Sequence, residues 1–180
     1  MRKQHELIDL ARKSIRCFLE GKRLFVEEEI KKKYIALGTC FVTLKLNGHL
    51  RGCIGSLQAR QELWRDVVAN AINAAFFDPR FQPLSLDEFE KVKIEISILS
   101  KPKKISYKSI DELKKKIYKK GVVIKKGNNV ATYLPQVWQE LPNAEIFLSS
   151  LCMKAGLNKD AWKTEKLEVY VYGVKKISED

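Results

Sequence analysis

The sequence has few of the residues that usually build a metal centre. Among its 180 residues there are two histidines, His5 and His49, and four cysteines. The cysteines, at positions 17, 40, 53 and 152, form no closely spaced pair. Zinc and iron–sulfur sites normally take their ligands from such pairs. We therefore expect no metal site and no cofactor held by this chain.

Long apolar runs are also missing. No stretch of the sequence approaches the ~20 apolar residues that are needed to cross a bilayer. The first residues, Met-Arg-Lys-Gln-His-Glu, do not lead into the uninterrupted apolar stretch of a signal peptide. Cysteines without partners suit a reducing compartment. We therefore expect a cytoplasmic protein that does not interact with membranes.

The charge is strongly unbalanced towards lysine. The net charge is +12, and there are 26 lysines but only eight arginines. A basic surface attracts nucleic acid, although lysine is poorer than arginine at bidentate recognition of phosphate or guanine. The lysines are spread along the chain and mostly alternate with apolar residues, as on a solvated face. Weak, sequence-independent binding of nucleic acid and attraction to an acidic partner both stay open.

The length and the hydrophobic pattern predict a single α+β domain over residues 1–180, with a mostly antiparallel sheet packed with helices. Inserted segments can form a smaller subdomain. Asn47-Gly48 predicts a tight hairpin, and serine followed three residues later by glutamate predicts helix starts at Ser85 and Ser109. Residues 22–36 are ambiguous. The expected helices are 5–19, 61–77, 86–90, 109–118, 134–140 and 143–155, and the expected strands are 39–46, 50–54, 92–100, 121–125, 130–133 and 167–174.

The most informative segment is 48–57, Gly-His-Leu-Arg-Gly-Cys-Ile-Gly-Ser-Leu. Side chains alternate along a strand, so Arg51 and Cys53 are expected to point the same way. Gly52 and Gly55 leave the backbone bare, which lets another group approach closely. A cation beside a thiol and beside exposed amides is typical of a reactive or anion-binding site.

Two interpretations of Cys53 stay open: a catalytic nucleophile, or a small structural or binding contact. A nucleophilic cysteine normally needs a base, usually a histidine. His49 is four strand residues away, about 13 Å at the usual rise per residue, and His5 belongs to the N-terminal helix. We therefore expect that Cys53 is not a strongly activated nucleophile in the isolated protein.

Arg51 is expected to meet an acidic partner or an anionic ligand, because an arginine on a glycine-rich strand is costly to bury alone. The candidate partners are Asp78 and Glu95. We expect Leu50–Ser56 to lie at a concave surface with Arg51 bonded to one of these two carboxylates. A structural salt bridge and ligand binding are both compatible with that arrangement.

Two further segments carry candidate binding residues. Asp78-Pro79-Arg80-Phe81 ends an apolar helix, and its acid and cation either form a surface ion pair or line a cleft. Tyr133-Leu134-Pro135-Gln136 joins a strand to a helix, and proline at the helix start leaves the amide of Gln136 free to bind. Lys154 lies near a helix C-terminus, where a cation is favourable without any ligand.

The hexapeptide Leu50-Arg51-Gly52-Cys53-Ile54-Gly55 resembles the signature of the AMMECR family, which is named for the Alport syndrome, mental retardation, midface hypoplasia and elliptocytosis chromosomal region protein. Other segments follow in the order found in the family, and together they span most of the chain. They are Asp78-Pro79-Arg80-Phe81 with Pro83-Leu84, Glu95-Ile96-Ser97-Ile98-Leu99-Ser100, Tyr133-Leu134-Pro135-Gln136-Val137 and Lys154-Ala155-Gly156. The chain departs from the family at Lys120, where many relatives carry histidine.

The resemblance implies an α+β fold whose hexapeptide lines a cleft between a larger and a smaller part. Microbial relatives are associated with Memo-type and radical-SAM-type proteins, so it implies an accessory or enzymatic component of a modification system. Arg51, Arg80 and the amides of Gly52–Gly55 would bind a polar or anionic group beside Cys53. The alternatives are a basic, nucleic-acid-associated regulator and a scaffold whose glycine-rich strand pairs with a partner peptide.

Overall fold

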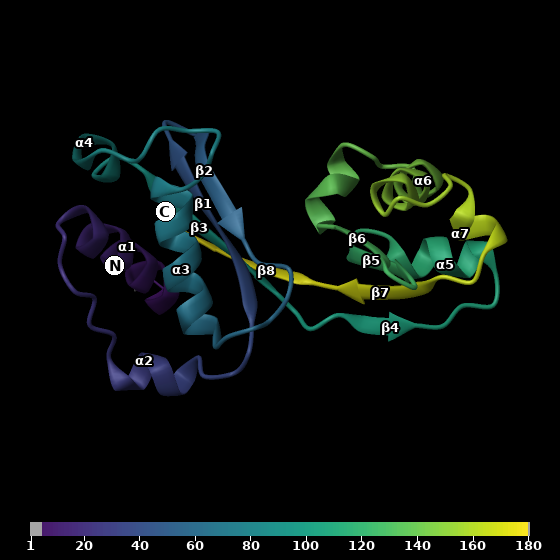
Figure 1. The fold of residues 1–180 in the computed structure, drawn as a ribbon, viewed down its shortest axis with the longest axis horizontal. Coiled ribbons are helices and arrows are strands. Elements are labelled where there is room, and N and C mark those ends of the chain that lie inside the picture. Colours follow the sequence, from purple (N-terminus) through teal and green to yellow (C-terminus); the bar gives the residue numbers. More distant parts are fainter. Residues whose placement is uncertain (1–4, 180) are drawn as a thin grey trace. The chain divides into compact units, whose positions relative to one another are not determined.

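The computed structural model describes residues 5–179, and the chain divides into two compact units. Unit 1 consists of the residues up to Leu99 and from Lys175 onwards, and unit 2 consists of Ser100–Val174. Each unit has its own four-stranded sheet and its own hydrophobic core (Figure 1). Unit 2 is inserted between two strands that are neighbours in the sheet of unit 1.

Unit 1 is a sheet with its helices packed on one face. Its elements are α1 (Glu6–Leu19), α2 (Glu28–Lys33), β1 (Thr39–Leu46), β2 (His49–Gly55), α3 (Leu63–Phe76), α4 (Leu86–Phe89), β3 (Lys93–Leu99) and β8 (Val174–Ser178). The strand order is β2-β1-β3-β8, and β1 is antiparallel to both β2 and β3.

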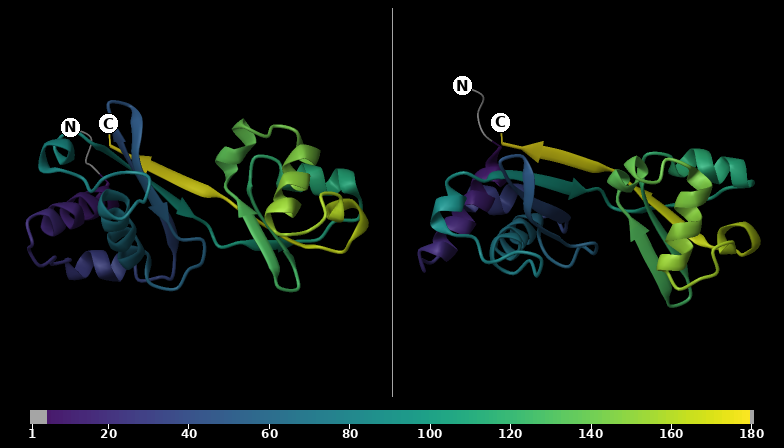
Figure 2. Two further views of the ribbon diagram at one scale, coloured as in Figure 1. Left: turned by 45° about the horizontal axis from the view of Figure 1, so that its top comes forward. Right: turned by 90° about the horizontal axis from the view of Figure 1, so that it is seen from above.

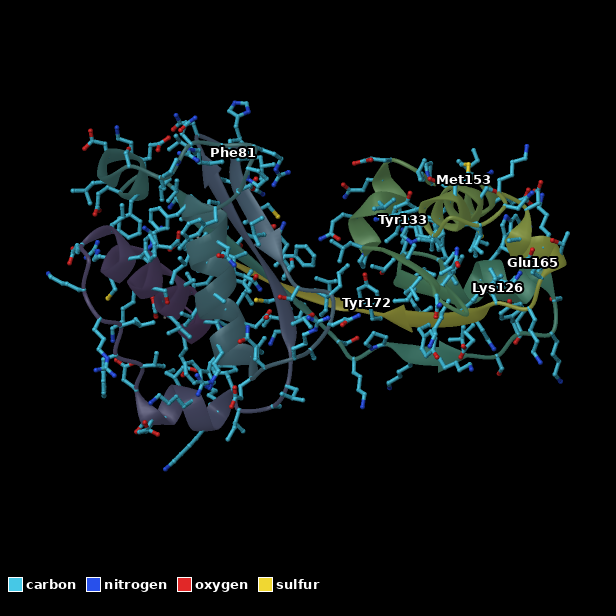
Figure 3. The ribbon with its side chains drawn as sticks, in the orientation of Figure 1. Phe81, Lys126, Tyr133, Met153, Glu165 and Tyr172 are labelled. Atoms are coloured by element: carbon cyan, nitrogen blue, oxygen red, sulfur yellow. The ribbon has the colours of Figure 1, made fainter. Side chains whose placement is uncertain are left out.

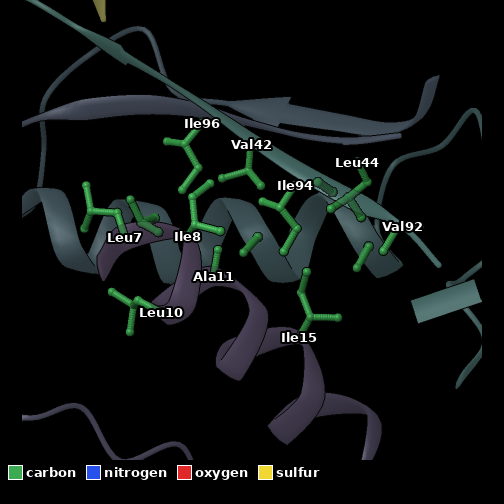
Figure 4. Packing of buried hydrophobic residues seen from close by; sticks show 14 of the residues in the cluster. Leu7, Ile8, Leu10, Ala11, Ile15, Val42, Leu44, Val92, Ile94 and Ile96 are labelled. Carbon is green, nitrogen blue, oxygen red and sulfur yellow. The ribbon is translucent and has the colours of Figure 1, made fainter. Parts of the chain in front are cut away.

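The core of unit 1 lies between this sheet and helix α1, with α3 beside it (Figure 4). Alternate strand residues such as Val42 and Ile96 point inward and are fully buried. They meet Leu7, Ile8 and Ile15, which recur at three- and four-residue spacing on α1 and are also fully buried. The other strand residues therefore face away from the helices.

Unit 2 repeats this arrangement with different elements. They are β4 (Lys103–Ile105), α5 (Ile110–Ile117), β5 (Gly121–Lys126), β6 (Asn129–Tyr133), a 3₁₀ helix η1 (Pro135–Gln139), α6 (Ala144–Lys154), α7 (Ala161–Thr164) and β7 (Glu168–Tyr172). The antiparallel strand order is β4-β7-β5-β6. Its core joins Val122 and Ile124 of β5 to Phe147 and Leu151 of α6.

The predicted α+β class with antiparallel sheets is confirmed. Asn47 and Gly48 both have positive φ angles, 52° and 82°, as a two-residue hairpin requires. Both halves of the capping box at Ser85 are formed. The helix predicted over 134–140 is a 3₁₀ helix at residues 135–139, and three short elements, α2, β4 and α7, had not been predicted.

The single strand predicted over 167–174 is wrong. Residues 168–172 form β7 of unit 2, and residues 174–178 form β8 of unit 1, so Gly173 separates strands of two different sheets. The two chain segments that connect the units are bonded to each other at this point: Ser100 N donates to Gly173 O and Gly173 N donates to Ser100 Oγ, both at 2.9 Å. Figure 2 shows the two segments leaving the sheet of unit 1 together.

Within residues 5–179, no helix is both long enough and apolar enough to cross a membrane.

Candidate functional site

Strand β2, which carries the hexapeptide, lies at the edge of the sheet in unit 1. Its pairing with β1 skips one residue: Lys45 lies opposite Leu50, and Leu44 lies opposite Gly52, so Arg51 has no partner on β1. An extra residue of this kind is a β-bulge, which bends the strand and redirects a side chain. The argument from alternation, which put Arg51 and Cys53 on one face, therefore does not hold across residue 51.

Arg51 is bound inside the protein. Its Nε and Nη2 donate to Oε1 and Oε2 of Glu88, both at 2.8 Å, and Nη2 also donates to Gln82 O at 2.9 Å. The residue is 9% exposed. The Arg51 guanidinium lowers the pKa of Glu88 to about 2, although partial burial opposes this shift.

The prediction that Arg51 bonds to Asp78 or Glu95 is wrong. Its partner, Glu88, is the capping-box residue of α4, and the carboxylate that bonds Arg51 also accepts from Ser85 N at 3.1 Å. The bulge at Arg51 and the short helix α4 together place the two groups; the helix was predicted from the sequence, but the bulge was not. The pair brings opposite charges together, and Arg51 thereby holds α4 against β2.

Asp78 and Arg80 hold the backbone of Cys53 from the open side of β2. Asp78 Oδ2 accepts from Cys53 N at 2.9 Å, and Arg80 Nη2 donates to Cys53 O at 3.1 Å. Asp78 and Arg80 are themselves joined by bonds of 2.9 Å from Nε and 2.7 Å from Nη2. Asp78 is almost fully buried, and the hydrogen bonds from Arg80 hold its pKa well below the usual range. We call Cys53, Asp78 and Arg80 the Cys53 clamp.

At the two glycines of the hexapeptide, other parts of the same chain approach the backbone closely. A Cβ on Gly52 would lie 2.1 Å from the carbonyl oxygen of Ala74, so α3 approaches β2 more closely than any side chain allows. A Cβ on Gly55 would lie 2.3 Å from the ring of Phe41. The close approach expected at these glycines therefore occurs, and its partners are a helix and a neighbouring strand.

On the sheet face away from the helices, Cys53 belongs to a row of polar side chains. Thr43 lies directly opposite Cys53 on β2 and opposite Glu95 on β3. Opposite residues share a face, so the three side chains form one row across three strands. The Thr43 Oγ1 and Cys53 Sγ atoms are 3.3 Å apart. We call Cys53, Thr43 and Glu95 the outer-face row.

Glu95 ends this row between two lysines. Its Oε2 accepts from Lys45 at 3.1 Å and from Lys176 of β8 at 2.7 Å. Burial tends to raise the pKa of Glu95, but the bonds from Lys176 and Lys45 outweigh it and lower the pKa. The carboxylate is therefore ionised and already hydrogen-bonded, which makes it a poor base for the thiol. Two strand spacings, about 10 Å, also separate it from Cys53.

The whole chain resembles known proteins. Residues 8–177 match the AMMECR1 family. The chain belongs to the AMMECR1 family. A protein of Nanoarchaeum equitans is 40% identical over 97% of this chain and 99% of its own length. A protein of Aquifex aeolicus is 40% identical over 93% of this chain and 88% of its own length.

The fold of the family is also seen in a solved structure. The crystal structure of an uncharacterized protein from Pyrococcus horikoshii matches with a TM-score of 0.79 and 32% sequence identity, over 97% of this chain and 90% of that one. Identity above 30% across nearly the whole length supports the same α+β fold and the family membership. This similarity does not indicate which reaction, if any, the protein catalyses.

The sequence did not reveal a buried polar network beside the site. Asp66 of α3 is 2% exposed, and its carboxylate accepts from Cys40 N, Asn70 Nδ2, Ser56 Oγ and Gln61 Nε2 at 2.8–3.1 Å. These bonds fix α3 to the ends of β1 and β2. The only signal in the sequence was a polar pair four residues apart, Asp66 and Asn70, on the apolar side of a helix.

Gln136, a candidate binding residue, lies in unit 2 and is exposed on η1. The residues of the Cys53 clamp and the outer-face row all lie in unit 1, so a role for Gln136 beside them stays a prediction. Among residues 5–179, no group of three or more histidine, cysteine or acidic residues could hold a metal ion.

Proposed function

We propose that this AMMECR1-family protein is a binding component of a modification system, and that it holds a polar or anionic group against the outer-face row beside Arg80. The observation that carries the proposal is the Cys53 clamp, because Asp78 and Arg80 bond both the amide and the carbonyl of Cys53. The backbone beneath the thiol is fixed before any ligand arrives. Such preorganisation reduces the cost of binding.

An edge strand can be covered simply to prevent aggregation, and the clamp does cover β2 at this residue. Two features favour binding over protection alone. About half of the Arg80 side chain, 53%, is exposed, so its guanidinium faces solvent while it bonds Cys53 O. The Cys53 thiol is only partly buried and lies beside the Thr43 hydroxyl. A guanidinium from the loop after α3, a thiol on β2 and a hydroxyl on β1 are thus all at least partly exposed.

The arrangement supports non-covalent binding better than nucleophilic catalysis. Thr43 is the neighbour of the thiol, and a threonine hydroxyl is too weak a base to activate it. Lys45 and Lys176, both partly exposed, add positive charge at the Glu95 end of the row. A group that carries a carboxylate or phosphate is therefore favoured over a cationic one.

Catalysis in this proposal belongs to partners. The family resemblance suggests Memo-type and radical-SAM-type proteins in the cytoplasm, and this chain would present a substrate or a segment of a partner to them. The alternative that β2 pairs with a partner peptide is less favourable at Cys53, because its outward amide and carbonyl already have partners.

Alkylation with a charged and a neutral reagent tests the proposal. Iodoacetate carries a carboxylate and iodoacetamide does not. A site that attracts anions therefore raises the rate of alkylation by iodoacetate relative to the rate by iodoacetamide at Cys53. The partly buried Cys17 on α1 provides an internal comparison, read by mass spectrometry of the same sample. We expect Arg80→Gln to lower the ratio at Cys53 a few-fold, by about five at most, which is the size of one exposed ion pair.

The matched control is Arg65→Gln, since Arg65 forms an exposed ion pair with Glu62 and is also about half exposed, at 55%. We expect this variant to leave the ratio at Cys53 unchanged. A ratio at Cys53 equal to that at Cys17, and insensitive to Arg80→Gln, would contradict the proposal. Full cellular function of a folded Cys53→Ala, Arg80→Gln double variant would do the same.

A further inference from the structure

Two segments of unit 2 that the proposed function does not use are brought together by the fold. Tyr133 ends β6, and Lys154 ends α6. The Lys154 ammonium lies 4.7 Å from the centre of the Tyr133 ring and donates to Thr132 O at 3.1 Å. Figure 3 shows Tyr133 at the side of the sheet that α6 covers. A cation therefore lies on the backbone of β6.

Strand β6 is the edge of the sheet in unit 2. It is joined to β5 by the two-residue loop Gly127-Asn128, with Lys126 opposite Asn129. In such a hairpin the residues beside the loop form a hydrogen-bonded pair, and outward-pointing residues then alternate with inward-pointing ones. Val130 and Thr132 consequently direct their N–H and C=O groups away from β5. The bond from Lys154 to Thr132 O agrees with this assignment.

Helix α6 holds this edge strand in place at three points. Asn129 Nδ2 donates to Ala155 O, just beyond the helix, at 2.7 Å, and the Tyr133 hydroxyl lies 2.8 Å from Ser150 Oγ. The third bond is that of Lys154. A strand that is fixed along its length offers its outward groups to a partner without first being ordered.

From this geometry we infer that the free edge of β6 binds an extended, acidic segment of a partner protein by strand addition, with Lys154 bonding an acidic side chain of that segment. Main-chain hydrogen bonds to Val130 and Thr132 would supply the pairing. Lys154 is exposed on a flexible stem, so it can leave Thr132 O when the incoming backbone arrives. This inference is independent of the outer-face row in unit 1.

The charge of unit 2 selects the occupant. Residues 100–174 contain 15 lysines, no arginine and seven acidic residues, which gives +8 of the chain's net +12. A second copy of this unit would bring an equal positive charge to the edge and be repelled. An acidic segment is attracted. A lysine that protects an edge strand from self-association and a lysine that attracts an acidic strand both act through positive charge. A measurement of binding to an acidic peptide distinguishes the two roles.

The test uses the full chain and a fluorescein-labelled hexapeptide of alternating glutamate and valine, followed by fluorescence anisotropy at low salt. Two matched peptides accompany it: one with lysine in place of glutamate, and one with alternate backbone amides methylated so that they cannot donate. We expect the acidic peptide to bind and the two matched peptides not to bind. Equal binding of the methylated peptide, or no binding of the acidic peptide at millimolar concentration, would overturn the inference.

Two variants locate the binding. Val130→Pro removes an outward amide at an edge position where proline is tolerated, and we expect it to abolish binding while the fold is retained. Lys154→Ala is expected to weaken binding by about fivefold at most, the value of one exposed ion pair. The control Lys159→Ala removes an exposed lysine after α6 and should change nothing. If an oligothymidylate displaces the peptide and binds Val130→Pro as well as the parent protein, the surface is a nucleic-acid site and the inference is wrong.

Discussion

Arg51 and Glu88 are joined by two parallel hydrogen bonds, Nε to Oε1 and Nη2 to Oε2, each 2.8 Å long. This bidentate pair links the bulge in β2 to the first turn of α4. The guanidinium carbon of Arg51 also lies 5.8 Å from the centre of the Phe81 ring. The arginine of the family hexapeptide therefore stabilises the loop that carries Asp78 and Arg80, and it supports the Cys53 clamp indirectly.

Glu88→Gln tests this pair. Near neutral pH we expect a loss of about 2 kcal/mol in the free energy of unfolding, because a buried guanidinium loses its counter-charge. The value is below that for fully buried pairs since 31% of the Glu88 side chain is exposed. The Arg51 guanidinium lowers the pKa of Glu88 to about 2, below the ordinary value near 4.3. The carboxylate therefore contributes fully above the ordinary value, and its contribution is lost as the pH falls towards 2.

Urea unfolding of both proteins between pH 7 and pH 2 measures this effect, and the difference between them should shrink over the lowest two units. Glu90→Gln is the matched control. Glu90 pairs with Arg16 at the surface, with 60% and 51% of the side chains exposed, so its loss is expected to be about 0.5 kcal/mol or less. A difference for Glu88→Gln that is equally large at pH 2 and pH 7 would show that charge is not its cause.

The elements that the sequence predicted well are those with a local cause. The hairpin at Asn47-Gly48 and the cap at Ser85 each depend on two to four neighbouring residues, and both form as expected. Helix α1 follows from its apolar spacing in the same way. The split at Gly173 has no such local signal. Residues 167–174 read as one alternating strand, and only long-range pairing assigns its two halves to different sheets.

The sequence predicts which residues form the site, but it does not predict the hydrogen bonds that join them. The sequence predicts Cys53, Asp78 and Arg80 as site residues, but no pattern in it indicates that the acid and the cation bond the backbone of the cysteine. Arg51 was expected to need a carboxylate, and it has one, but Glu88 was known only as a capping residue. A bulge moves a side chain by breaking the alternation on which sequence reasoning relies.

Gly52→Ala should be strongly destabilising. The new Cβ would lie 2.1 Å from Ala74 O, a backbone atom within α3 that cannot move without shifting the helix. We expect a loss of about 3 kcal/mol or more in the free energy of unfolding, the upper range for overpacking. Gly21→Ala is the control, because Gly21 has a positive φ of 63° but no atom within 4 Å of a Cβ. Strain alone should cost about 1 kcal/mol there. Equal losses by urea unfolding would argue against close packing of α3 on β2.

Asp66→Asn should damage the junction of α3 with the sheet. Both carboxylate oxygens of Asp66 accept hydrogen bonds, including one of 2.9 Å from Cys40 N. An amide would place a donor against donors in a site that is only 2% exposed, so we expect a loss of about 2 kcal/mol. The exposed Asp87→Asn should cost about 0.5 kcal/mol or less. Comparable stability of both variants in thermal unfolding would show that the network is not stabilising.

Asp78→Ala removes the acceptor of the Cys53 amide while leaving Arg80 in place, and hydrogen exchange reports on that amide directly. We expect exchange at Cys53 to become about tenfold faster, which corresponds to one lost hydrogen bond to a charged group. The hydrogen bonds from Arg80 hold the pKa of Asp78 far below its ordinary value, so the carboxylate stays charged, and its contribution to stability is kept, well below pH 4. Protection of Cys53 in the parent protein should therefore persist at pH 4. Val130, an outward edge amide of β6, provides the comparison and should exchange fast in both proteins. If the Cys53 amide exchanges as fast as that of Val130 before the substitution, the clamp does not hold the backbone in solution, and the preorganisation on which the proposed function rests is absent.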